Sequence, residues 1–210
     1  ICLISGVSKF ENLYGADVAA HLLSNPPYPH EVRFRNDAEA ALVGEARFGN
    51  AARYRRIIGL TLGTGIGSAF MVDGVVTKFP NAHSADGWLY PVLFNGVPAD
   101  EIFSTRGIES RLSAKGCTTY SVADAAEEAH RGDRRCRDVF DAFGRDLGTF
   151  LAPFVESFSA DAVLILGGIA RSLDLFHKPL LAQLPPVEIV SSSLGDRAAV
   201  LGAAALFRDS

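Results

Sequence analysis

A glycine turn at residues 63–68 has the composition of a phosphate-binding loop. Gly63, Gly65 and Gly67 stand within five residues, and Thr64 lies between the first two. Glycine has no side chain to keep a ligand away, so backbone N–H groups in such a turn can approach a phosphate closely. A plain glycine hairpin accounts for the same residues equally well. The chemistry of the turn therefore depends on what stands beside it in the fold.

A second candidate is the pair Asn36-Asp37, which directly precedes the alanine-rich segment 38–46. That segment has high helix propensity and is expected to end near Gly49. An Asp at the start of a helix is a common N-cap, and it is also a residue type that serves as a general base. The local pattern leaves both interpretations open.

The glycine turn separates two apolar runs, residues 57–62 and 69–72, which are predicted to be strands. Asp73-Gly74 follows and predicts a two-residue hairpin turn. No helix pattern comes after the glycine turn, which excludes the Walker and Rossmann phosphate loops. The turn is therefore expected to join two strands.

A fully apolar run at residues 162–166 closes in Gly167-Gly168 and precedes a short helical segment. A buried strand that ends in paired glycines is typical of the ligand-binding edge of an α/β sheet. The other expected strands are residues 1–4, 31–35 and 187–190, and the other expected helices are residues 16–23, 102–112, 121–130, 133–158 and 198–207. Pro153 is expected to kink or divide the long helix at 133–158. This order of elements predicts an α/β fold.

Composition narrows the function. The 210 residues are 48% hydrophobic and carry a net charge of −4 without a basic cluster, which gives no support for nucleic-acid binding. The sequence contains no run of 18 apolar residues, so it predicts no membrane span. The three cysteines are widely spaced, which favours reduced thiols in a cytoplasmic protein over a disulfide framework or a zinc site.

Three segments together resemble the ROK family of sugar kinases: residues 36–38, 62–67 and 163–168. The closing segment 194–204 also matches the last helix of that family, so the resemblance runs in order along essentially the whole chain. It implies an actin-like (ribonuclease H-like) fold of two lobes, with ATP and a sugar meeting in the cleft. Residues 1–37 would be a remnant of the N-terminal lobe, and residues 38–210 the nucleotide-binding lobe, whose last helix returns toward the other lobe.

The resemblance also implies roles for single residues. Asp37 would be the general base that takes a proton from the attacking sugar hydroxyl, and Asn36 and Asp37 would hold the sugar. Glu101 resembles a sugar-contacting Glu of the family. ATP with Mg²⁺ would be the cofactor, its phosphates and adenosine bordered by Gly63, Thr64, Gly65, Gly67, Gly167 and Gly168. The resemblance further implies a homodimer, and it assigns no residue of this chain to a metal.

The sequence departs from the family pattern in two places. Residues 1–10 lack the acidic residue and paired glycines of the family's opening strand, and the only methionine is Met71, so N-terminal sequence is expected to be missing. Trp88 and Pro91 stand where the family has a Glu and a His that serve the sugar. No cysteine lies between Met71 and Cys117, so structural zinc is not expected. These departures keep an alternative open, a non-catalytic sugar- or nucleotide-binding regulator.

Overall fold

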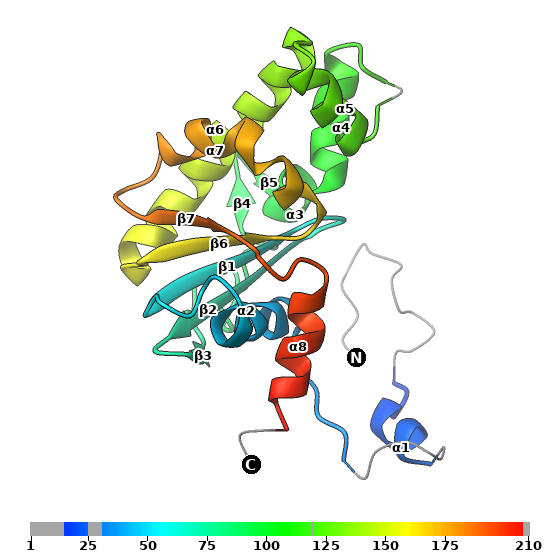
Figure 1. The fold of residues 1–210 in the computed structure, drawn as a ribbon, viewed down its shortest axis with the longest axis vertical. Coiled ribbons are helices and arrows are strands. Elements are labelled where there is room, and N and C mark those ends of the chain that lie inside the picture. The colour runs from blue at the N-terminus through cyan, green and yellow to red at the C-terminus, as the bar shows by residue number, and fades with distance from the viewer. Residues whose placement is uncertain (1–14, 25–30, 119, 208–210) are drawn as a thin grey trace. The chain divides into compact units, whose positions relative to one another are not determined.

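The computed structural model describes residues 15–24, 31–118 and 120–207 (Figure 1). The chain divides into two units, Ile1–Phe34 and Arg35–Ser210, slightly before the predicted lobe boundary after Asp37. In the first unit, helix α1 (Val18–Leu23) confirms the helix expected there, and its N-cap Asp17 accepts the Ala20 N–H at 2.9 Å. The strand predicted at residues 1–4 lies outside the described residues. The assignment of lobes stays a prediction.

A five-stranded sheet forms the centre of the second unit, in the order β3-β2-β1-β6-β7. Strands β1, β6 and β7 are parallel, whereas β2 and β3 are antiparallel to their neighbours. A separate two-stranded ribbon pairs β4 with β5. The bounds are β1 Arg56–Leu62, β2 Ile66–Val72, β3 Val75–Thr77, β4 Leu93–Phe94, β5 Val97–Pro98, β6 Ala162–Leu166 and β7 Glu188–Ser191. The strands predicted around both turns, at 162–166 and at 187–190 are thereby confirmed.

The turn between β2 and β3 has the predicted hairpin form. Asp73 and Gly74 both have positive φ, 48° and 80°. Two consecutive left-handed residues match the right-handed twist of the flanking strands, which is why Asp-Gly is a preferred pair there. Arg55, which directly precedes β1, forms an ion pair with Asp73 at 2.8 Å.

Helices cover both faces of the sheet (Figure 1). Helices α2 and α8 pack on one face, where Leu42 and Ala198 join a buried cluster with Ile57, Met71 and Leu164. The remaining helices of the unit lie on the other face, around a larger apolar core. The bounds are α2 Asp37–Phe48, α3 Ala99–Ile102, α4 Thr105–Ala114, α5 Val122–His130, α6 Arg134–Phe158, the 3₁₀ helix η2 Gly168–Ser172, α7 Leu173–Leu181 and α8 Arg197–Ala205.

Three expectations need correction. Residues 31–36 form no strand, so the strand predicted at 31–35 is wrong. Phe34 is 67% exposed, which shows that the alternating pattern of this segment does not mark a buried face. The helix expected at 102–112 is divided into α3 and α4 at Phe103-Ser104. Of the two effects predicted for Pro153, the division is wrong: helix α6 continues through the proline, with buried side chains on both sides that anchor it to the core.

Helices α2 and α8 touch backbone to backbone. A Cβ added at Gly44 would stand 2.0 Å from the Ala198 carbonyl oxygen, and one added at Gly202 would stand 1.7 Å from the Ala40 carbonyl oxygen. Each helix therefore contributes one glycine at the contact, and the two backbones can come this close only because these residues have no side chain. This contact holds α2 at a fixed distance from the C-terminal helix.

We expect Gly202→Ala to lower the free energy of unfolding by about 1–3 kcal/mol, because the new methyl group has to push the helices apart. Urea denaturation measures the loss. The exposed neighbour Ala203 gives a matched control, since Ala203→Ser should change stability by no more than about 0.5 kcal/mol. A Gly202→Ala protein as stable as the control would contradict the close helix contact.

Candidate functional site

The carboxyl ends of the parallel strands bring two of the predicted glycine segments together. Strand β1 runs into Gly63 and β6 runs into Gly167, with Thr61 opposite Leu166 in the register. Gly167 has φ 89°, and a Cβ there would stand 2.4 Å from the Leu62 carbonyl oxygen. The turn after β6 therefore passes directly against the end of β1. In α/β sheets, ligands bind at this edge.

The glycine turn joins β1 to β2 as expected, and its glycines serve different purposes. None of Gly63, Gly65 and Gly67 has a positive φ, so none of them is required by a left-handed backbone. A Cβ at Gly67 would stand 2.3 Å from Thr61 Oγ1, whereas a Cβ at Gly63 would meet no atom of the described residues within 4 Å. Gly168 faces open space in the same way. Gly63 and Gly168 thus leave room for a ligand. The side chain of Thr64, between Gly63 and Gly65, is exposed.

Asn36 and Asp37 begin helix α2. The Asn36 side chain is the N-cap, and its Oδ1 accepts the N–H groups of Ala38 at 3.0 Å and Glu39 at 3.3 Å. Asp37 is exposed at the first helical position, where its Oδ1 accepts the Ala38 N–H at 2.8 Å. Asn36 thus fills the capping role that Asp37 also matched in sequence. No donor in the described part of the chain contacts Asp37 Oδ2, which is left for another partner.

The start of α2 lies against the exit of the glycine turn. A Cβ at Gly67 would be 3.1 Å from the Ala38 Cβ, and Ala38 is buried. Because Ala38 follows Asp37 directly, the carboxylate and the glycine turn stand at the same end of the sheet. The structure therefore gathers Asn36, Asp37, the glycine turn and the Gly167-Gly168 turn into one region.

Among the described residues, no hydrogen bond or ion pair links the Glu101 side chain to the glycine turn. Glu101 is an exposed residue of α3, and its neighbour Asp100 contacts the glycine turn instead. The Ile66 N–H donates to Asp100 Oδ1 at 2.9 Å, and Thr105 donates to the Gly63 carbonyl from both its N–H and its hydroxyl. Sequence reasoning missed both residues, because they follow the turn by some 34 to 42 positions and no local pattern connects them.

Trp88, one of the two residues that depart from the family pattern, forms an aromatic pair with Tyr90. The rings of Trp88 and Tyr90 lie 5.9 Å apart, and both side chains are half-buried. The Leu89 N–H between them donates to Ser68 Oγ of β2 at 2.9 Å. Since Ser68 follows Gly67, this aromatic segment is fastened to the strand that leaves the glycine turn.

A buried carboxylate ties α2 to the third parallel strand. Glu45 is fully buried, and its two oxygens accept four hydrogen bonds of 2.5 to 3.1 Å, from the backbone of Asn50 and Leu194 and the hydroxyls of Ser192 and Ser193. Burial raises the pKa of Glu45, but the four hydrogen bonds together outweigh it, so the pKa lies below its ordinary value of 4.5. The ionised carboxylate therefore fixes the loop that leaves β7 at the ligand edge.

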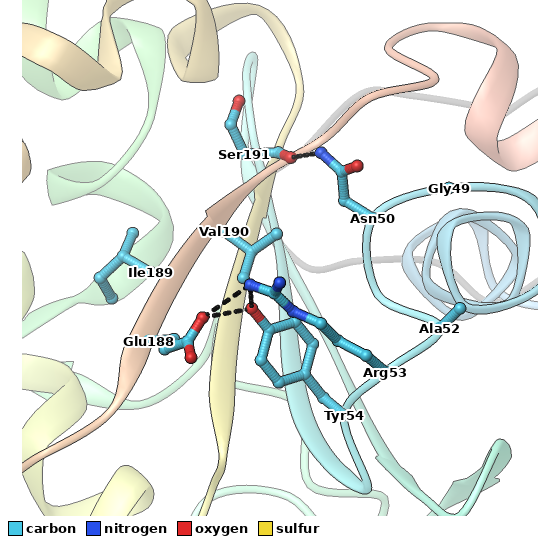
Figure 2. A pocket seen from close by; sticks show the side chains of 9 residues that line it. All are labelled: Gly49, Asn50, Ala52, Arg53, Tyr54, Glu188, Ile189, Val190 and Ser191. Atoms are coloured by element: carbon cyan, nitrogen blue, oxygen red, sulfur yellow. Dashed lines mark hydrogen bonds and ion pairs between the residues drawn. The ribbon is translucent and has the colours of Figure 1, made fainter.

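A cavity of about 520 Å³ lies elsewhere, at the outer side of β7 (Figure 2). It contains none of the predicted site residues, and several of its polar groups pair with one another. Arg53 pairs with Glu188 at 2.9 Å, Tyr54 hydrogen-bonds the same carboxylate, and the Asn50 amide donates to the Ser191 carbonyl at 3.1 Å. The hydrogen bond from Tyr54 lowers the pKa of Glu188, with Arg53 adding to it. We interpret the residues that line this cavity as a cover over the edge strand β7. The cavity is not the site of the predicted chemistry.

In residues 15–24, 31–118 and 120–207, no group of three or more His, Cys, Asp or Glu side chains is placed to hold a metal ion. Among the helices of the same ranges, none is long and apolar enough to cross a membrane.

A model of the ROK family matches residues 17–210. The chain belongs to the ROK family. One similar member is a glucokinase of Thermotoga maritima, 27% identical over 212 residues, an alignment that covers 85% of this chain and 66% of the glucokinase. A xylose repressor of Bacillus subtilis is 24% identical over 199 residues, which cover 87% of this chain and 52% of the repressor.

The fold is likewise that of the family. The crystal structure of a ROK family glucokinase from Streptomyces griseus in complex with glucose and AMPPNP superposes with a TM-score of 0.77 at 21% identity, over 91% of this chain and 72% of that one. The predicted fold class, the actin-like α/β fold of sugar kinases, is thereby confirmed. The chain spans about two thirds of the length of the glucokinases of this family that it matches.

We expect Glu45→Gln to lower the free energy of unfolding by about 1–3 kcal/mol at neutral pH, because the new NH₂ group faces buried donors. The folded-state pKa lies below the unfolded one, so the stabilisation by Glu45 is present above about pH 4.5 and is lost as the pH falls through the folded-state value. The difference between wild type and variant should therefore shrink in acid.

Urea denaturation at neutral pH and at the lowest pH where the protein folds measures this change. Ser193→Ala removes one of the four donors and should cost less than Glu45→Gln. A stability difference that stays constant with pH would show that Glu45 is not ionised in the folded protein.

Proposed function

We propose that this protein is an ATP-dependent kinase that phosphorylates a hexose or a related sugar or polyol, with Asp37 as its general base. The observation that carries the proposal is the meeting of two elements at one end of the sheet. The helix that begins with Asp37 packs through Ala38 against Gly67, which leaves the glycine turn. Membership of a family that contains glucokinases supports the same activity.

Asp37 has the position that a base needs. Its carboxylate is exposed, and Asn36 supplies the helix cap, so catalysis does not compete with capping. In the proposed step, Asp37 Oδ2 takes the proton of a sugar hydroxyl while the hydroxyl oxygen bonds to the γ-phosphorus and ADP leaves. Positioning and charge neutralisation supply most of the catalysis in such transfers, and one well-placed carboxylate completes it.

ATP fits the open glycines at the strand ends. Within the described part of the chain, Gly63 and Gly168 face open space on adjacent turns, so phosphates could approach the backbone of residues 63–67 while the adenosine lies beside Gly167 and Gly168. Mg²⁺ bound with ATP would neutralise the charge of the phosphates. Its ligands would be phosphate oxygens and water, with few protein groups. We assign no residue of this chain to the metal.

The sugar would lie between Asp37 and the aromatic segment. Asn36 keeps its side-chain NH₂ group for a sugar hydroxyl, since only Oδ1 is used in the cap. Glu101 remains a proposed sugar contact, although its side chain is exposed on α3. Trp88 stands where the family pattern has a Glu and pairs with the ring of Tyr90, so we expect a sugar whose recognition depends less on that carboxylate.

A second candidate is a regulator that binds a sugar or nucleotide without catalysis. Trp88 and Pro91 favour it, because they replace residues that serve the sugar in the kinase pattern. The similarity to a xylose repressor, over 87% of this chain, agrees with it. We further propose that the protein works in the cytoplasm, in keeping with the free thiols of Cys117 and Cys136, and that it forms a homodimer.

We expect Asp37→Asn to lower kcat by about 10²- to 10⁴-fold, the usual contribution of a positioned base. Steady-state kinetics on the protein expressed from its complete gene measures the effect. Glu39→Gln is a matched control, because it removes a carboxylate from the same first turn of α2 and should leave kcat nearly unchanged. Near-normal turnover in Asp37→Asn would exclude it as the base.

The activity itself is tested by ADP release with Mg-ATP and a panel of hexoses, amino sugars and polyols. We expect release that depends on one sugar class and disappears in Asp37→Asn. If no sugar elicits release while calorimetry still detects sugar or nucleotide binding, the regulator replaces the kinase as the function.

A further inference from the structure

The glycine turn is held in place from outside. Within the turn, the Gly63 N–H donates to the Gly65 carbonyl at 3.0 Å. The stronger set of contacts comes from the α3–α4 region, where Thr105 donates to the Gly63 carbonyl at 2.7 and 2.9 Å and Asp100 accepts the Ile66 N–H at 2.9 Å. Both ends of the turn are therefore anchored to one short stretch of chain.

Asp100 is itself rigidly placed. Its Oδ2 pairs with Arg106 Nη2 at 2.8 Å, and its backbone N–H donates to the Tyr90 carbonyl at 3.2 Å. The side chain is only 25% exposed. It presses so closely on the turn that a Cβ at Gly65 would stand 2.5 Å from Asp100 Oδ1. The fit explains why residue 65 has to be glycine, independent of any ligand.

A carboxylate beside a phosphate site needs a reason, because like charges repel. The ion pair with Arg106 supplies one, since it offsets the charge of Asp100 while Oδ1 still accepts the Ile66 N–H. The pair can therefore orient the turn without driving an anion away. A neutral side chain too short to reach Ile66 would lose this anchor.

We propose that Asp100, supported by Arg106, is a positioning residue that holds the glycine turn in the shape that receives the nucleotide phosphates. The proposal rests on the proposed ATP-dependent function. It assigns Asp100 to the nucleotide and not to the sugar, although the neighbouring Glu101 is the residue that resembles a sugar contact. Pre-ordering the turn strengthens nucleotide binding because less conformational freedom is lost on binding.

The test compares Asp100→Ala, Asp100→Asn and Arg106→Ala with Asp146→Ala in the protein expressed from its complete gene. Asp146 pairs with Arg111 of the same helix α4 at 2.7 Å and has no contact with the turn, which makes it a matched control. Calorimetry measures the Kd of AMPPNP and of the sugar that elicits ADP release. Hydrogen exchange measures protection of the backbone amides at residues 63–67.

We expect Asp100→Ala to raise the Kd of AMPPNP about tenfold and to speed exchange at residues 63–67, with the Kd of the sugar nearly unchanged and a modest fall in Tm from the lost acceptor. Arg106→Ala should have a smaller effect of the same kind. Asp100→Asn, which keeps an acceptor for the Ile66 N–H, should restore much of the amide protection. Asp146→Ala should match wild type in both measurements.

Two results would overturn the proposal. One is unchanged AMPPNP binding and amide exchange in Asp100→Ala, and the other is weaker sugar binding with nucleotide binding intact, which would make Asp100 a sugar contact. Failure of the proposed function is a separate outcome. In that case wild type binds no nucleotide, yet faster exchange in Asp100→Ala still supports the anchor on the turn.

Discussion

The buried carboxylate of Glu45 is the interaction on which the arrangement around the site depends. Taking a carboxylate out of water is costly unless hydrogen bonds replace the lost hydration. Four donors do so here, and they come from two segments, the end of α2 and the loop after β7. One ion therefore joins the helix that begins with Asp37 to the loop that leads into α8. The backbone contact at Gly44 and Gly202 then sets the spacing of the two helices.

The glycines of the ligand edge fall into two groups with different causes. Gly65, Gly67 and Gly167 are required by the protein itself, because a Cβ would collide with Asp100, Thr61 or the Leu62 carbonyl. Gly63 and Gly168 meet nothing, so packing within the described residues gives no reason for them. A glycine-rich pattern in sequence mixes both groups. Only the three-dimensional neighbours separate the glycines that build the edge from those that leave it open.

Local patterns predicted what local physics decides. Strands β1, β2 and β6 and the Asp73-Gly74 turn each depend on residues close in the chain. The strand predicted at 31–35 was wrong, because alternating apolar and polar residues form a strand only where a partner strand and a buried face exist. The contacts of Asp100 and Glu45 were also beyond reach, since their partners lie about 34 and 150 positions away and any Asp or Glu in a helix looks alike in sequence.

The covered side of β7 has a consequence for how this protein behaves in a crowded solution. An open strand edge invites a strand from another molecule to add to the sheet and so begins aggregation. Here the strand is only four residues long, the Asn50 amide occupies the Ser191 carbonyl, and the Arg53–Tyr54–Glu188 group places charges beside the remaining backbone (Figure 2). The sheet ends at β7, and this edge is therefore a poor template for a strand from another molecule.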